Sequence, residues 1–144
     1  MDEHLRKSII LEHYSNPLNK GLVDDDSYYK VNMNSESCID NLDFQVKIKD
    51  DKIIDAKFDG EACAISTSAS SILTDLVIGK TLKEALNIIE NYECMIEEKP
   101  YNKEVLHEAL VYSEIYKQAN RKKCAMLPSI AIKKMIEKEE LNEK

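Results

Sequence analysis

The sequence contains no tryptophan, and its 144 residues include only three glycines and three prolines. So little glycine and proline excludes collagen-like repeats and low-complexity linkers, which depend on these residues. No stretch of the sequence approaches the roughly 18–20 consecutive apolar residues of a membrane-spanning helix. The first residues, MDEHLRKS, lack the apolar segment of a secretory signal peptide. We therefore expect a cytoplasmic protein with no membrane contact.

The sequence has fewer basic than acidic residues. There are 20 Lys and Arg against 27 Asp and Glu, which gives a net charge of −7. The average field of such a chain repels nucleic acids and anionic membranes. The longest basic run, Arg121–Lys123, is too short to serve as a nucleic-acid footprint. We expect neither nucleic acid nor membrane as a partner.

The rest of the composition is that of a globular protein, with 43% apolar and 33% charged residues. The length fits one domain over residues 1–144. The C-terminal segment from about residue 137 is highly charged, and we expect it to fray.

Hydrophobic periodicity predicts one helix and then three strands in the first part of the chain. Helical spacing of apolar residues covers residues 5–14, and Pro17 follows their end. Period-two alternation predicts strands over residues 29–34, 42–48 and 53–58. In the last of these strands we place Ile54, Ala56 and Phe58 on the buried side. Asp50-Asp51 predicts a hairpin turn between the second and third strands.

Helical patterns fill the second part of the chain. One helix is predicted over residues 65–77, and a capping box at residues 81–84 begins the next, which Pro100 breaks. Residues 102–119 predict one or two short helices. A last helix is expected to begin at Cys124, which keeps Pro128 near its first turn. The sequence thus predicts an α+β fold, a small three-stranded antiparallel sheet with helices packed on one face.

Three of the four cysteines lie where predicted elements meet. Cys38 follows the first strand, Cys63 separates the third strand from a helix, and Cys124 opens the last helix. Helix starts favour the thiolate form, and Asp40 adds a carboxylate close to Cys38. Three thiolates and a carboxylate can form a tetrahedral metal site. Four inert buried thiols are the alternative that the residues themselves leave open.

The remaining candidate ligands do not fit this pattern. Cys94 lies in the middle of a predicted helix, away from any junction, and we interpret it as structural. The three histidines, His4, His13 and His107, have no metal-ligand spacing.

Three short motifs mark the chain: ILEHYSNPLNKG at residues 10–21, FDGEACAIS at residues 58–66 and KCA at residues 123–125. Together they resemble the motifs of the IscU/SufU family of iron–sulfur assembly proteins. The resemblance runs from about residue 5 to about residue 136. Cys63 and Cys124 lie 61 positions apart, and Lys123 stands where IscU-type scaffolds have histidine. Both features resemble the SufU branch, as does the absence of the IscU-type Leu-Pro-Pro-Val-Lys chaperone motif.

The resemblance implies a function and a site. It implies Cys38, Asp40, Cys63 and Cys124 as ligands of Zn²⁺, with Cys38 as the sulfur acceptor. The implied activity is a zinc-dependent sulfurtransferase that takes persulfide sulfur from a SufS-type cysteine desulfurase. The sulfur, or a cluster, would then pass to a downstream acceptor protein.

Two alternatives stay open at this point. The same ligands could hold a [2Fe–2S] cluster on a scaffold protein, in which case Asp40 would ease cluster release. A non-catalytic zinc domain is the other alternative. It is motivated by Ile39 and Ala62, which stand where the family has or commonly has glycine. Lys123 and the long cysteine spacing favour the sulfurtransferase over the scaffold.

Overall fold

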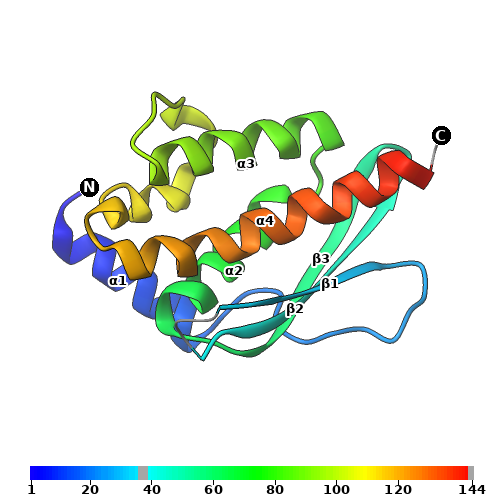
Figure 1. The fold of residues 1–144 in the computed structure, drawn as a ribbon, viewed down its shortest axis with the longest axis horizontal. Helices are drawn as coiled ribbons and strands as arrows, with labels where there is room; N and C mark the ends of the chain where they lie inside the picture. Colours follow the sequence, from blue (N-terminus) through cyan, green and yellow to red (C-terminus); the bar gives the residue numbers. More distant parts are fainter. Residues whose placement is uncertain (36–38, 143–144) are drawn as a thin grey trace.

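The computed structural model describes residues 1–35 and 39–142. Its elements follow the predicted order of a helix, strands and helices (Figure 1). They are α1 (Glu3–Ser15), β1 (Tyr29–Asn34), β2 (Asn41–Lys49), β3 (Lys52–Glu61), α2 (Ala64–Val77), α3 (Leu82–Ile96), the 3₁₀ helices η1 (Lys103–Val105), η2 (His107–Tyr112) and η3 (Ile115–Lys117), and α4 (Ala119–Asn142).

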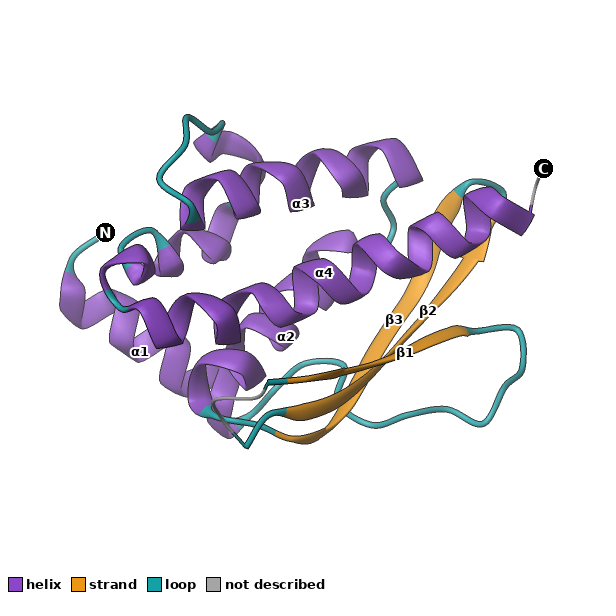
Figure 2. Ribbon diagram, viewed as in Figure 1, coloured by secondary structure: helices purple, strands orange, loops and turns teal. Residues whose placement is uncertain are grey.

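Within the described residues, the sheet has three antiparallel strands in the order β1-β2-β3. The hairpin turn between β2 and β3 is the predicted one, at Asp50-Asp51. Both residues have positive φ, 52° and 64°, which a two-residue type I′ hairpin requires. Helices cover one face of the sheet, as predicted (Figure 2). On the other face, Gln45 exchanges hydrogen bonds of 2.9 Å with the backbone of Val23.

The prediction of which side chains of β3 are buried is wrong at the start of the strand. Ile53 is fully buried, whereas Ile54 is 44% exposed. The cause is a register shift: Lys47 pairs with Asp55 and Ile48 pairs with Ile53, so that Ile54 is an extra residue in β3. Beyond this bulge the alternation holds, and Ala56 and Phe58 are buried as predicted.

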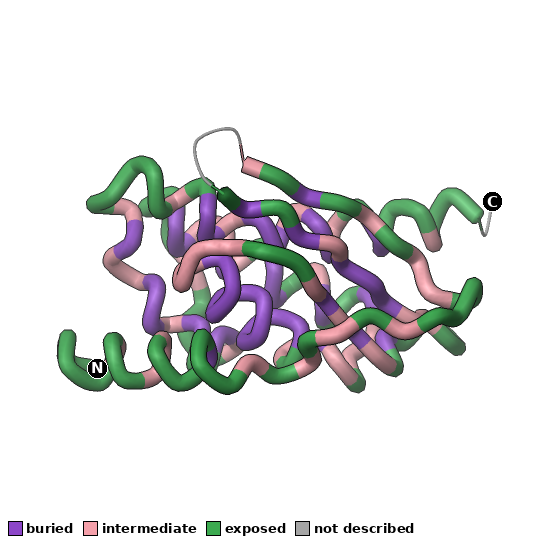
Figure 3. Tube along the Cα trace, turned by 90° about the horizontal axis from the view of Figure 1, so that it is seen from below, coloured by how far each residue is buried: buried purple, intermediate pink, exposed green. Residues whose placement is uncertain are grey.

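Helix α2 lies at the centre of the molecule. Every residue from Ser66 to Thr74 is buried, including the serines and threonines. Figure 3 shows buried residues gathered in the interior, with α1 largely exposed on one side. Ser70 and Thr74 can be buried because their hydroxyls donate back along the helix, to the Ser66 carbonyl (2.7 Å) and to the Ser70 carbonyl (2.6 Å).

Helix α4 differs most from its prediction. It begins at Ala119 rather than at Cys124, and it contains Pro128 in its interior. The segment from residue 137 is helical as far as Asn142 instead of frayed. It is held against β1, because the Tyr29 hydroxyl donates to Glu139 and the Lys138 ammonium donates to the Lys30 carbonyl (2.9 Å).

The predicted capping box is present, with Thr81 and Glu84 bonded reciprocally at the start of α3. The segment predicted to form one or two short helices, residues 102–119, differs in number, because it contains three short 3₁₀ helices. None of the helices in the described part of the chain combines the length and the apolar character that crossing a membrane requires.

Candidate metal centre

The candidate centre lies at the end of the sheet where β2 begins and β3 ends. Asp40 directly precedes β2, and Cys63 follows β3 by two residues. Because Asn41 pairs with Glu61 in the antiparallel register, the start of β2 lies beside the end of β3. The Cys63 backbone N–H donates to Asp40 Oδ1 at 2.8 Å, which joins the two directly.

Gly60 allows the two strands to approach each other at this end. Its φ is +132°, a backbone conformation that L side chains rarely adopt. A Cβ at this position would lie 2.2 Å from the Asn41 carbonyl oxygen. Glycine is thus required immediately before the segment that carries Cys63.

Cys63 occupies the N-cap of α2, as the sequence predicts. Its Sγ accepts a hydrogen bond from the Ser66 backbone N–H at 3.5 Å. Ala62, which precedes it, is not among the residues with positive φ. An alanine therefore fits here without backbone strain, although the resemblance expects glycine.

Cys124 is not at a helix start, and that prediction is wrong. It is the sixth residue of α4 and is only 2% exposed. The basic triplet before it does not end a loop but belongs to the first turns of α4. The thiol of Cys124 therefore reaches the centre through the packing of α4 on α2.

The structure brings Asp40, Cys63 and Cys124 together. One carboxylate oxygen and the two Sγ atoms lie within 4.8 Å of one another. In a tetrahedral zinc site with Zn–S bonds of about 2.3 Å, ligand atoms lie roughly 3.3–3.8 Å apart. Small side-chain movements would close this difference, so these residues fit a metal ion of this kind.

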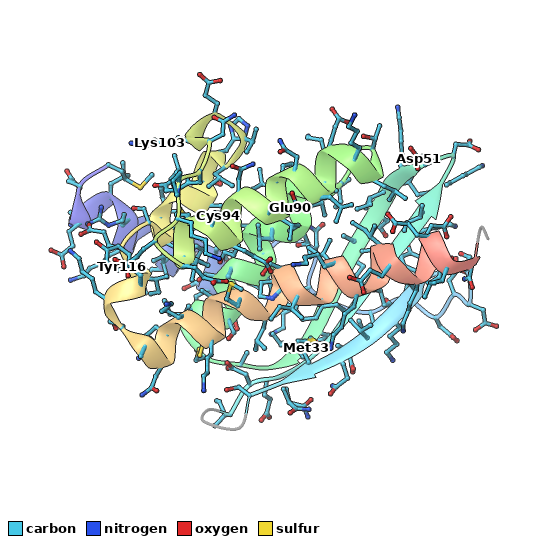
Figure 4. The ribbon with its side chains drawn as sticks, turned by 45° about the horizontal axis from the view of Figure 1, so that its top comes forward. Met33, Asp51, Glu90, Cys94, Lys103 and Tyr116 are labelled. Atoms are coloured by element: carbon cyan, nitrogen blue, oxygen red, sulfur yellow. The ribbon has the colours of Figure 1, made fainter. Side chains whose placement is uncertain are left out.

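Two of the sequence predictions concern the other cysteines. Cys38 lies outside the described residues. Cys94 is half-buried on α3, one turn after Glu90 (Figure 4), and it is not part of the group formed by Asp40, Cys63 and Cys124. Its interpretation as a structural residue stays a prediction.

Burial and hydrogen bonds shift the pKa values of Asp40 and Cys124. Burial acts to raise the pKa of Asp40, but hydrogen bonds from Ser66, the Cys63 N–H and both thiols outweigh it, so the pKa lies below its usual value. Burial, followed by hydrogen bonds to Asp40 and Cys63, raises the pKa of the Cys124 thiol well above its usual value. Without a metal Cys124 is therefore a thiol, contrary to the thiolate expected from a helix start, and a bound metal would have to displace its proton.

Sequence reasoning missed Ser66. Its side chain is fully buried among the three grouped residues. The sequence places Ser66 three residues after the helix cap, where a backbone N–H needs a side-chain acceptor. This position indicates a contact with Cys63, but not the contacts of the Ser66 hydroxyl with Asp40 and Cys124.

Comparisons with known proteins show which proteins this chain is similar to. A family model described as "NifU-like N terminal domain" matches residues 5–138. The chain is 34% identical over 137 residues to "Zinc-dependent sulfurtransferase SufU" of Bacillus subtilis, a match covering 94% of this chain and 92% of that protein. It is 36% identical over 137 residues to "Iron-sulfur cluster assembly scaffold protein IscU" of Streptococcus pyogenes, covering 94% and 84%.

Solved structures share the fold. A crystal structure of a hypothetical protein superposes with a TM-score of 0.86 at 33% identity, covering 94% of this chain and 99% of the other. A structure described as a putative iron–sulfur cluster assembly scaffold protein for the SUF system, from Fervidobacterium islandicum, gives a TM-score of 0.80 at 26% identity, with the same coverage.

Proposed function

Because this chain belongs to the family of NifU-like N-terminal domains, we propose that it is a zinc-dependent sulfurtransferase of iron–sulfur cluster assembly. One observation carries the proposal. Two thiols and a carboxylate converge at one end of the sheet, in a chain that is 34% identical to a protein named for this activity. Thiol chemistry of this kind needs a reducing compartment, and we place the protein in the cytoplasm.

The proposed ligands are Asp40, Cys63 and Cys124 together with Cys38, which stands two positions before Asp40 in the sequence. When bound, Zn²⁺ would keep the cysteines as thiolates and would add no redox chemistry of its own. Asp40 is the harder ligand, so a site with one carboxylate is less tightly closed than a site with four thiolates. Such a site favours exchange of one ligand.

Cys38 is the residue we assign as sulfur acceptor. Cys63 is fixed as a helix cap and Cys124 is fixed inside a helix, whereas Cys38 belongs to the segment between β1 and β2. Its thiolate would attack the outer sulfur of a persulfide on a SufS-type cysteine desulfurase. A new S–S bond forms at Cys38, the persulfide S–S bond breaks, and the electron pair leaves with the desulfurase cysteine as a thiolate.

A second function is a scaffold that assembles a [2Fe–2S] cluster on the same residues. The observation that favours it is the 36% identity to the S. pyogenes protein named as an IscU scaffold. Thiolate ligands suit both metals, and the two functions differ in what the isolated protein holds. In either case sulfur or a cluster would pass to a downstream acceptor protein.

The test combines metal analysis with desulfurase turnover. We expect colourless protein with about one zinc per chain, which increases the turnover of a SufS-type desulfurase. Cys38→Ala should abolish this stimulation, and sulfur mapped by mass spectrometry on the wild type should lie on Cys38. Cys94→Ser is the matched control and should retain both zinc and stimulation.

Three results would contradict the assignment, each in a different way. Two irons per chain with visible charge-transfer absorption would favour the scaffold. Full activity of Cys38→Ala, with sulfur on Cys63 or Cys124, would remove Cys38 as acceptor. Bound zinc without stimulation by the wild type would leave a non-catalytic zinc domain.

A further inference from the structure

We propose that Ser66 is a positioning residue of the metal centre, an inference that rests on the proposed function. Ser66 is fully buried and contacts every member of the group. Its backbone N–H donates to Cys63 Sγ (3.5 Å), and its hydroxyl lies 2.6 Å from Asp40 Oδ2 and 3.1 Å from the Cys124 carbonyl oxygen. One small side chain thus ties together two candidate ligands and the backbone of the third.

The contact with Cys124 has a cause in the sequence of α4. In an α-helix the carbonyl of residue 124 accepts from the N–H of residue 128, but residue 128 is proline and has no N–H. A buried carbonyl without a partner costs free energy, so another donor must replace the missing one. The Ser66 hydroxyl, which comes from α2, lies 3.1 Å from this carbonyl oxygen and shares its one proton between this oxygen and Asp40.

The next carbonyl along α4, that of Ala125, also accepts a hydrogen bond from another helix. The hydroxyl of Tyr92, on α3, donates to the Ala125 carbonyl at 2.8 Å, and Tyr92 is fully buried. The turn that carries Cys124 is therefore fixed from two sides, by Ser66 and by Tyr92. This fixes the direction of the Cys124 side chain before any metal binds.

The contact with Asp40 fixes the carboxylate in the same way. Oδ1 accepts from the Cys63 N–H at 2.8 Å, and Oδ2 accepts from the Ser66 hydroxyl at 2.6 Å. Both oxygens are thus oriented. The hydroxyl has a single proton and two acceptors. If Asp40 Oδ2 binds a cation instead, the Ser66 hydroxyl can still donate to the Cys124 carbonyl. The buried hydroxyl proton then keeps an acceptor.

The experiment measures zinc affinity by competition with a chromophoric chelator. We expect Ser66→Ala to bind zinc about 10- to 100-fold more weakly than the wild type, the usual effect of removing a partner that orients a metal ligand. With Co²⁺ in place of zinc, the ligand-field absorption of Ser66→Ala should shift, because Asp40 is held by one hydrogen bond fewer. A role in folding alone would leave this spectrum unchanged.

Two further variants serve as controls. Ser70→Ala removes another fully buried hydroxyl of α2, which donates to the Ser66 carbonyl and not to any of the three candidate ligands. This variant should bind zinc as tightly as the wild type does. Ser66→Thr retains the hydroxyl and should recover most of the affinity and the wild-type Co²⁺ spectrum. It also provides a second folded variant if Ser66→Ala does not fold.

The outcomes separate this inference from the proposed function. Wild-type zinc affinity in Ser66→Ala, an equal loss in Ser70→Ala, or a folded Ser66→Thr that does not recover affinity would each overturn the role of Ser66 while the zinc site stands. Failure of the wild type to bind zinc would overturn the proposed function, and the role of Ser66 with it.

Discussion

At the scale of single residues, Gly60 sets how closely β2 and β3 approach beside the metal centre. Gly60→Ala would place a Cβ 2.2 Å from the Asn41 carbonyl oxygen at a φ of +132°. Backbone strain alone costs about 1–3 kcal/mol, and the contact adds to it. We expect the free energy of unfolding, measured by urea titration, to fall by more than about 2 kcal/mol.

Gly21→Ala is the matched control for this prediction. Gly21 also has positive φ, +116°, but a Cβ there would have no atom within 4 Å. This variant should therefore lose only the contribution of backbone strain, and less than Gly60→Ala. An equal loss in both would show that the approach to Asn41 has no energetic consequence of its own.

At the scale of elements, Pro128 is buried in the interior of α4, a position where proline is unfavourable. Proline costs about 3 kcal/mol relative to alanine in a helix interior, and burial of its ring offsets only part of this. We expect Pro128→Ala to raise the free energy of unfolding by about 1 kcal/mol, since the new N–H can bond to the Cys124 carbonyl. Thermal and urea unfolding of the metal-free protein measure this change.

The opposite result for Pro128→Ala would also be informative. A lower melting temperature would mean that the packing of α4 between β1 and α3 depends on the proline ring. Ser129→Ala in the same turn provides a comparison, because Ser129 bonds to Glu93 (2.9 Å) and has no part in the Cys124 contact.

At the scale of the whole molecule, the candidate ligands tie together elements that are distant in the sequence. Asp40 precedes β2, Cys63 caps α2 and Cys124 lies in α4. A metal bound only by the folded state stabilises it by RT ln(1 + [L]/Kd), about 4 kcal/mol at a thousandfold excess over Kd. Removing zinc with a chelator should therefore lower the melting temperature by several degrees, with the change measured by calorimetry.

Restoring zinc should restore the melting temperature, and Cys94→Ser should respond to chelation as the wild type does. An unchanged melting temperature after complete zinc removal would contradict the prediction that the metal links these elements.

The sequence predicted the elements whose signals are local. Alternation over a few residues marks each strand, the hairpin turn follows from Asp50-Asp51, and the box at residues 81–84 begins α3. Cys63 was placed correctly because a helix cap is defined by its immediate neighbours. The motifs that resemble the IscU/SufU family are equally local, and the comparisons confirm the family.

Only the tertiary structure decided the features that depend on distant partners. The extra residue Ile54 is visible only in the pairing of β3 with β2, and the C-terminal segment is ordered because Glu139 meets Tyr29, 110 positions away. Cys124 reaches the centre from inside α4 through the packing of α4 on α2, where the Ser66 hydroxyl also contacts the carbonyl that lacks a helical partner because residue 128 is proline. Periodicity and caps report neighbours in the chain, whereas strand register, burial and side-chain partners are fixed when separate elements pack together.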